Sequence, residues 1–209
     1  MGRIPIWNSI QYSAAAGLLT AFFATFSAYI IHRKVAFGRK FFDFLAILPA
    51  AIPGTFMGIG YILAFNSSPL ILTGTSAIII LNMAARSLPV GYRTACGTLQ
   101  QIHPSIEESA MDLGAHLPRV FKDIIFPLLK TSFVFSFIYT FMVSMNTLSS
   151  VIFLVSAGTN LATVFIIQFV ERGEWSTAAA MALGTMIMTF SVLAIFHGVV
   201  RGKKERFQG

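Results

Sequence analysis

The stretch EESAMDLGAHLPRVFKDIIFP, residues 107–127, is the most informative part of this chain. It is a polar segment between long apolar runs, and it contains two short helical patterns. Ser105 and Glu108 form an S-x-x-E capping box, which predicts a helix that starts at Ile106. Gly114 suits the position just past the end of that helix, where the backbone turns left-handed.

Two prolines predict the structure after Gly114. Pro118 fits the first turn of a second short helix, where its missing N–H is not needed. Pro127 cannot donate a backbone hydrogen bond, so it marks the shift into the next apolar span. The stretch therefore predicts a helix, a tight glycine turn and a second helix, held near a membrane surface.

The composition indicates a membrane protein with several spans. Of the 209 residues, 56% are hydrophobic and 11% are charged, and the mean hydropathy is +0.75. A soluble domain carries roughly twice that share of charged residues. The net charge of +7 is distributed by membrane side and not along one patch, so we predict no nucleic-acid binding. The single cysteine, Cys96, cannot form an internal disulfide, and the sequence shows no metal-site spacing of Cys and His.

We predict an all-α, polytopic membrane helix bundle with about five transmembrane helices, because a helix needs about 20 apolar residues to cross the hydrocarbon core. The predicted spans are residues 10–31, 44–65, 70–85, 131–154 and 177–200. The third span is short, and its start is the least defined. The first span has neither the basic segment nor the cleavage site of a secretory signal peptide, so we predict no such signal.

The basic residues predict the orientation of these spans. All of the 15 Lys and Arg except Arg3 and Arg172 fall between spans one and two, between spans three and four, or after span five. The positive-inside rule places those segments in the cytoplasm. We therefore expect the loop of about residues 86–130 and the C-terminus to lie inside, and residues 155–176 to lie outside.

Residues 107–127 resemble the EAA motif of ABC importer permeases, whose pattern is E-A-A-x3-G-x9-I-x-L-P. The residues at the motif positions are Glu108, Ser109, Ala110, Gly114, Ile124, Phe126 and Pro127. Ser109 replaces the first alanine and Phe126 replaces the usual leucine, and both suit a packed helix. The alternative is an ordinary amphipathic loop helix in which Glu108 serves only as a cap.

The resemblance implies that this loop is the coupling helix on which a separate ATPase docks. The residues assigned to ATPase coupling are Glu107, Glu108, Ser109, Ala110, Met111, Asp112, Gly114, Ile124 and Pro127. In this interpretation the three carboxylates supply charge for basic groups of the partner. Ala110, Met111 and Leu113 supply apolar contact.

The resemblance covers nearly the whole chain and is closest to the iron(III), phosphonate and thiamine branch of type I importers, which lie in the bacterial inner membrane. It implies one permease domain over residues 1–209. It also implies three partners: ABC ATPase subunits, a second permease unit and an extracytoplasmic substrate-binding protein. Related units usually have one more helix before these five. A truncated unit, one half of a longer fused permease and a start-site error are therefore all open.

Two spans contain candidates for a translocation pathway. Pro53 predicts a loosened or kinked second span, and Gly54 and Gly58 form a G-x-x-x-G that admits a close neighbour. In the fourth span the polar candidates are Ser144, Asn146 and Thr147. Static helix packing is the alternative for the second span, and an interhelical hydrogen bond is the alternative for Asn146.

The chain contains no G-x-x-x-x-G-K-[ST], so it has no phosphate-binding loop of its own. We expect no cofactor and no metal on this chain, with ATP and Mg bound by the partner ATPase. We see no catalytic constellation and expect no enzymatic activity. The predicted function is a permease subunit of an ATP-driven importer, for iron(III) or a related small solute. The alternative is a channel or secondary transporter that works without ATP.

Overall fold

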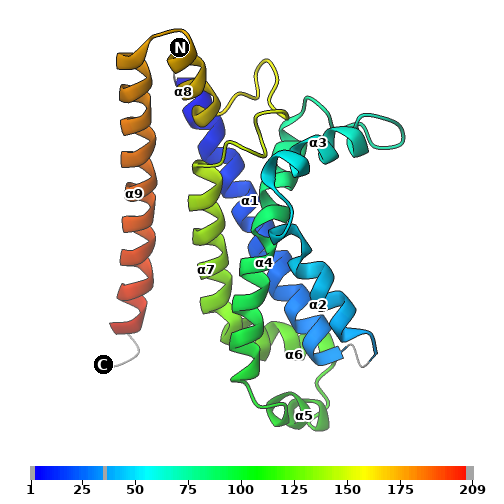
Figure 1. Ribbon diagram of the computed structural model, residues 1–209. Helices are drawn as coiled ribbons and strands as arrows, with labels where there is room; N and C mark the ends of the chain where they lie inside the picture. The colour runs from blue at the N-terminus through cyan, green and yellow to red at the C-terminus, as the bar shows by residue number, and fades with distance from the viewer. Residues whose placement is uncertain (1–2, 35–36, 206–209) are drawn as a thin grey trace. The chain divides into compact units, whose positions relative to one another are not determined.

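The structure, a computed structural model, describes residues 3–34 and 37–205, and this part of the chain contains helices and no strand. The elements in order are α1 (Arg3–Tyr29), η1 (Ile30–Lys34), α2 (Arg39–Ile47), η2 (Leu48–Ala50), α3 (Gly54–Phe65), α4 (Ser76–Gln100), α5 (Ser105–Asp112), α6 (Leu117–Val120), η3 (Phe121–Ile125), α7 (Phe126–Met145), α8 (Ala162–Glu171) and α9 (Trp175–Glu205) (Figure 1). Elements η1 and η3 are π-helical, and η2 is a 3-10 turn. The prediction of an all-α fold is confirmed.

The chain divides into two compact units, each built from segments that are distant in the sequence. Unit 1 comprises Met1–Ala16, Pro53–Met83 and Thr140–Gly209. Unit 2 comprises Gly17–Ile52 and Ala84–Tyr139, and it contains the whole of α2, α5 and α6. The single permease domain over residues 1–209 stays a prediction.

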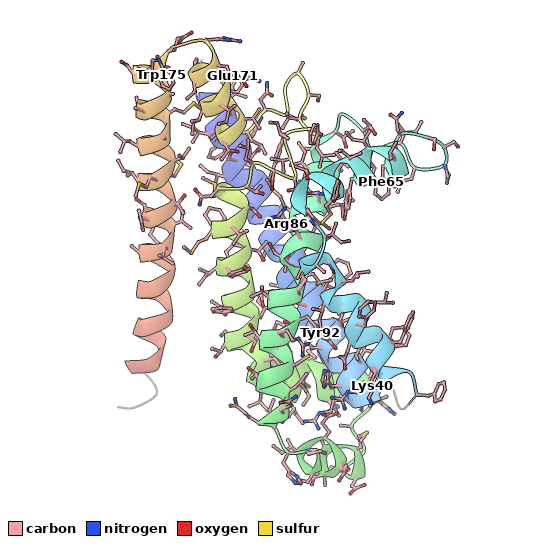
Figure 2. The ribbon with its side chains drawn as sticks, viewed as in Figure 1. Lys40, Phe65, Arg86, Tyr92, Glu171 and Trp175 are labelled. Carbon is pink, nitrogen blue, oxygen red and sulfur yellow. The ribbon has the colours of Figure 1, made fainter. Side chains whose placement is uncertain are left out.

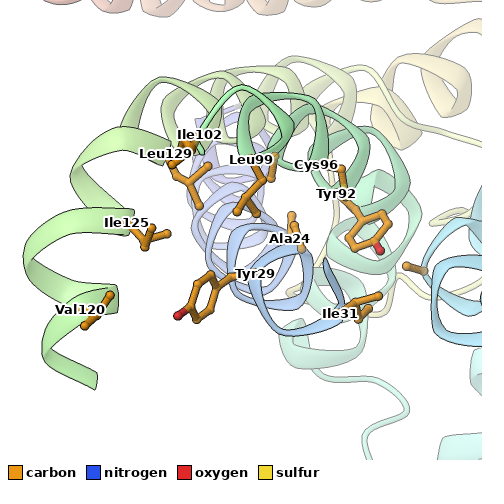
Figure 3. Close-up of a cluster of buried hydrophobic side chains, with 13 residues drawn as sticks. Ala24, Tyr29, Ile31, Tyr92, Cys96, Leu99, Ile102, Val120, Ile125 and Leu129 are labelled. Carbon is orange, nitrogen blue, oxygen red and sulfur yellow. The ribbon is translucent and has the colours of Figure 1, made fainter. Parts of the chain in front are cut away.

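Unit 2 is organised around one cluster of buried apolar side chains (Figure 3). The cluster joins the second half of α1, the second half of α4 and residues 120–129. Small residues let these helices approach closely, since a Cβ added at Gly91 would meet Ala24 Cβ at 2.9 Å and Ser136 Oγ at 3.0 Å. The cluster therefore fixes the ends of α1 and α4. Helix α5 follows the end of α4 after a short connection.

In unit 1, a non-helical segment of residues 146–161 connects α7 to α8. Asn8 Nδ2 donates hydrogen bonds to the carbonyl oxygens of Gly158 and Asn160, at 3.0 and 3.1 Å. The first backbone N–H of α8 donates to Ser9 Oγ at 2.9 Å. Backbone groups outside regular helices need such partners, because an unpaired buried N–H or C=O costs about as much as a lost hydrogen bond. Polar residues near the start of α1 thus hold this segment in place.

Three helices of the described part are long and apolar enough to cross a membrane, by length and composition: Ile4–Lys34, Leu117–Met145 and Trp175–Ile195. A fourth candidate consists of Arg39–Ala50 and Gly54–Phe65, two helices separated by a short break. Pro53 lies in this break, so the predicted interruption of the span is confirmed. The total of five spans stays a prediction.

Several predicted boundaries are wrong. Helix α4 begins at Ser76 and continues to Gln100, because its second half packs into the core of unit 2 and does not form a loop. The next long helix already begins at Leu117 and not at residue 131, while the cytoplasmic position of residues 86–130 stays a prediction. Helix α7 ends at Met145 and not at residue 154. At that end Asn146 Nδ2 donates to the Met142 carbonyl at 2.9 Å, and such side-chain bonds compete with helix continuation.

We expect Gly58→Ala to destabilise the protein and Gly60→Ala, its control on the same helix, to be harmless. A Cβ at Gly58 would collide with the backbone of Ser150, whereas a Cβ at Gly60 would have nothing within 4 Å. The first change should cost about 1–3 kcal/mol, as overpacking does. The second should be neutral or stabilising, because alanine is the better helix former. Thermal unfolding in detergent measures both, and equal melting temperatures would refute this packing.

Candidate functional site

The candidate site is built around α5, the short helix of residues Ser105–Asp112. Pro104 occupies its N-cap position with helical backbone angles and makes no side-chain cap, and the Ser105 N–H donates to His103 Nδ1 at 3.3 Å. Ser105 Oγ and His103 Nδ1 share a hydrogen bond at 2.8 Å instead. The predicted capping box of Ser105 and Glu108 is therefore wrong, because the helix begins one residue earlier than expected.

Gly114 ends α5 as the sequence predicts. Its φ is +87°, in the left-handed region that glycine adopts without strain. The Gly114 N–H donates to the Met111 carbonyl at 2.9 Å, and the Ala115 N–H donates to the Ala110 carbonyl at 3.0 Å. This pair of bonds is a Schellman motif, which satisfies carbonyls at the helix end. Nothing lies within 4 Å of a Cβ added at Gly114, so the backbone and not space requires glycine here.

Glu107 is buried, with 4% of the residue exposed. Its carboxylate lies 3.1 Å from Arg33 Nε and 3.3 Å from Lys34 Nζ, and it accepts a hydrogen bond from the Tyr29 hydroxyl at 3.2 Å. The expectation that Glu107 offers its charge to a partner is therefore wrong. Its charge is neutralised within the chain by cations at the end of the first helix.

Arg33 joins a third element to this site. Its Nη2 donates to the Leu99 carbonyl at 3.1 Å and also to the Ile102 carbonyl. These carbonyls lie at the end of α4, where helical carbonyls have no partner inside the helix. One guanidinium therefore ties η1, the end of α4 and α5 together.

The sequence did not single out Tyr29, Arg33 or Lys34, although it held a signal. Consecutive residues of a helix point about 100° apart. If one of the neighbouring residues Glu107 and Glu108 faces solvent, the other therefore points toward the protein. A carboxylate that points inward needs a cation, and Arg33 and Lys34 follow the first span.

The helix after Gly114 is not a separate short element, because α6, η3 and α7 follow one another without a gap from Leu117 to Met145. Pro118 lies in its first turn, as predicted. It then passes through the π-helical η3, where the Phe126 N–H donates to the Phe121 carbonyl five residues earlier. The wider turn comes directly before Pro127, which has no N–H to give. Ile124 is half-buried and packs against the core, while Pro127 is exposed.

The exposed face of α5 combines acidic and apolar side chains. Glu108 and Asp112 are exposed and, four residues apart, share one side of the helix. Ile106 and Leu113 are exposed on the adjacent side, and Leu113 is 89% exposed. We call these four residues the α5 face. Ser109 and Met111 are also exposed, and Ala110 is half-buried against the core, while the coupling role of these residues stays a prediction.

No family model matches the chain. The ferric transport system permease protein FbpB of Actinobacillus pleuropneumoniae is 38% identical over 193 residues, which are 92% of this chain and 28% of FbpB. The chain thus spans less than a third of that relative. The ferric transport system permease-like protein AfuB of Escherichia coli (strain K12) is 31% identical over 100 residues, 48% of this chain and 83% of AfuB.

The chain belongs to the ABC importer permeases. A more distant relative is the sulfate transport system permease protein CysT of Salmonella typhimurium, 27% identical over 87% of this chain and 69% of CysT. The fold of the permease is also found in the bacterial alginate ABC transporter solved with an alginate pentasaccharide-bound periplasmic protein. That match has a TM-score of 0.78 at 16% identity and covers 95% of this chain and 77% of the other.

The residues predicted for the pathway of the permease all lie in unit 1. Pro53 is exposed in the break before α3, and Gly54 and Gly58 are buried in that helix. Ser144 is buried, Asn146 is exposed, and the Thr147 carbonyl accepts a hydrogen bond from Thr163 Oγ1 at 2.8 Å. Asn146 bonds within its own helix end and not to another helix. Their role in translocation stays a prediction.

A second polar cluster surrounds Asp43 of α2 in unit 2. Its carboxylate accepts a hydrogen bond from the Tyr92 hydroxyl and lies 3.3 Å from His32 Nε2. Tyr92, which Figure 2 labels, lies on α4. Near it, burial raises the pKa of the Cys96 thiol to about 11, so this thiol stays protonated and unreactive. Within residues 3–34 and 37–205, no group of three or more His, Cys, Asp or Glu could hold a metal ion.

We expect Gly114→Ala to loosen α5, because a residue with a Cβ pays about 1–2 kcal/mol in the left-handed conformation. The control is Gly97→Ala, since Gly97 lies inside α4, has no positive φ and leaves open space for a Cβ. Amide hydrogen exchange in α5 should become roughly tenfold faster in the first variant and stay unchanged in the second. Unchanged exchange in both would show that the turn does not hold the helix.

Proposed function

We propose that this permease is part of the translocation pathway of an ATP-driven importer and that α5 is its docking element for a separate ATPase. The observation that carries the proposal is the α5 face, an acidic and apolar surface on a helix held from behind by Glu107. Leu113, which is 89% exposed, and the exposed Ile106 give the α5 face an apolar area that a docked partner would cover.

The α5 face suits a groove with an apolar floor and a basic rim. Short amphipathic helices bind such grooves through apolar anchors spaced along one side. Burying one leucine side chain contributes about 1.5–3 kcal/mol, so Leu113 would be a main anchor. The carboxylates of Glu108 and Asp112 would fix orientation more than affinity.

The charge distribution supports a cytoplasmic position for α5. Nine of the 15 Lys and Arg lie in unit 2, the unit that contains α5. Cytoplasmic segments of membrane proteins carry such an excess. We infer that the permease is a multi-pass protein of the bacterial inner membrane with α5 facing the compartment in which ATP is available.

The remaining partners follow from this assignment. The chain carries no phosphate-binding loop in its sequence, so ATP and Mg would be bound by the ATPase and no cofactor by this chain. A second permease unit would complete the pathway, either as a separate subunit or within a longer chain. A periplasmic protein would deliver the substrate, as one accompanies the alginate transporter.

For the substrate we propose iron(III), because the relatives FbpB and AfuB are named for ferric transport. Sulfate is the competing substrate class, since CysT is also a relative. Uptake of radioactive iron(III) and of sulfate by cells carrying the complete system separates the two. Iron uptake that is lost on deletion of this chain is expected, and sulfate uptake alone would exclude the iron proposal.

Cross-linking tests the docking of the ATPase. Leu113→Cys should cross-link to the ATPase subunit of the assembled transporter, because its side chain lies in the proposed interface. Phe37→Cys is the matched control, as Phe37 is a 95% exposed apolar residue of unit 2 outside α5. The native Cys96 is buried and does not interfere. Cross-linking at Phe37 but not at Leu113, or uptake that needs no ATP, would contradict the proposal.

The acidic side of the α5 face predicts a salt-dependent association. Replacing Glu108 and Asp112 by their amides should slow association with the ATPase by about tenfold at low salt, because complementary charge steers encounter. The difference in association rate between the variant and the unmodified protein should disappear at high salt, where exposed charges are screened. Asp123→Asn is the control, since Asp123 is exposed and pairs with Arg119 of its own helix. Equal rates for all three proteins would exclude electrostatic steering by α5.

A further inference from the structure

The two faces of α5 carry different chemistry. Toward the core of unit 2 the helix presents the small side chain of Ala110 and the carboxylate of Glu107. Apolar contact is non-directional and a small side chain allows the helix to rotate. Glu107 Oε2 accepts directional hydrogen bonds from the Tyr29 hydroxyl and from Lys34 Nζ, while Oε1 lies 3.1 Å from Arg33 Nε. The orientation of α5 is therefore set mainly by Glu107.

The partners of Glu107 all belong to the end of the first long helix. Tyr29 is the last residue of α1, and Arg33 and Lys34 lie in the π-helical η1 that continues it. Lys34 Nζ also lies 5.4 Å from the centre of the Tyr29 ring, a cation–π contact that orders its flexible stem. A π-helical turn within a helix is frequent at functional sites.

Breaking this arrangement would leave an uncompensated charge in a buried position. Removing one partner of a buried ion pair is strongly destabilising, because the remaining charge has lost both water and its counterion. Moving α5 away from η1 would separate Glu107 from Arg33 and Lys34 and would be unfavourable for the same reason. Moving α5 and η1 together would keep these ion pairs.

We propose that Glu107 is a positioning residue that latches α5 to the end of α1, so that a movement imposed on α5 moves α1 with it. This inference rests on the proposed docking of an ATPase, and it adds the route by which that docking reaches a membrane-spanning helix. Arg33 extends the latch to the end of α4 through its bonds to the Leu99 and Ile102 carbonyls.

A distance measurement on this chain alone tests the latch without any ATPase. Spin labels at Ser109→Cys on α5 and Phe23→Cys on α1 occupy exposed positions of unit 2, and the buried Cys96 stays unlabelled. In lipid nanodiscs the distance distribution should be single and narrow. Glu107→Gln should make it about twofold wider, because the buried ion pairs are lost.

Two further variants make this measurement specific. Lys34→Gln removes one cation of the latch but leaves Glu107 and Arg33 in place, and it should also widen the distribution. Glu108→Gln is the matched control, because its carboxylate is exposed on the adjacent residue of the same helix. It should leave the distribution unchanged. A distribution that stays narrow in both latch variants overturns the proposal.

The assembled transporter gives the functional readout. With the ATPase and binding protein present, Glu107→Gln should retain ATP hydrolysis, while the substrate taken up per ATP falls about tenfold, within the usual range of coupling free energies. A merely structural role would lower hydrolysis and uptake together. Glu107→Asp keeps the charge and should restore part of the coupling.

The distance measurement and the transport assay together distinguish a failure of the latch from a failure of the proposed function. A widened distribution together with uncoupled hydrolysis supports the latch. A widened distribution in a protein that never binds an ATPase supports the latch as a structural device and removes its role in coupling. An unchanged distribution in a permease that does bind the ATPase refutes the latch and leaves the docking proposal standing.

Discussion

The carboxylate of Glu107, buried between Arg33 and Lys34, is the interaction on which the site depends. A charged group removed from water is tolerated only where opposite charge and hydrogen bonds replace its hydration. Tyr29 and the two cations provide this replacement, all from the end of one long helix. The position of α5 is thereby tied to an element long and apolar enough to cross a membrane.

The neighbouring glutamate shows how one short helix serves two purposes. Glu107 faces inward and orients the helix, whereas Glu108 faces solvent one residue later. The Schellman turn at Gly114 then ends the helix after two turns and returns the chain to the core through the half-buried Ala115. This division leaves Leu113 and the outer carboxylates exposed to solvent.

Local chemistry made part of this arrangement predictable from the sequence. The left-handed turn at Gly114 and the break at Pro53 follow from backbone rules that need no tertiary information. The inward position of Glu107 does not, because it depends on cations more than 70 residues away in the chain. Helix α4 extends beyond its predicted end at residue 85 for a similar reason, since its second half packs into the core of unit 2. The role of Arg33 at the end of α4 is also a long-range effect.

The most direct test of this account is a double-mutant cycle between Glu107 and Lys34. Unfolding free energies of the unmodified protein, Glu107→Gln, Lys34→Gln and the double variant are measured by denaturant titration in mixed micelles. If the latch holds α5, the two changes are non-additive by about 1–3 kcal/mol, as expected for contacting residues. Additivity to within about 0.5 kcal/mol would show that the two side chains do not interact and would contradict the account.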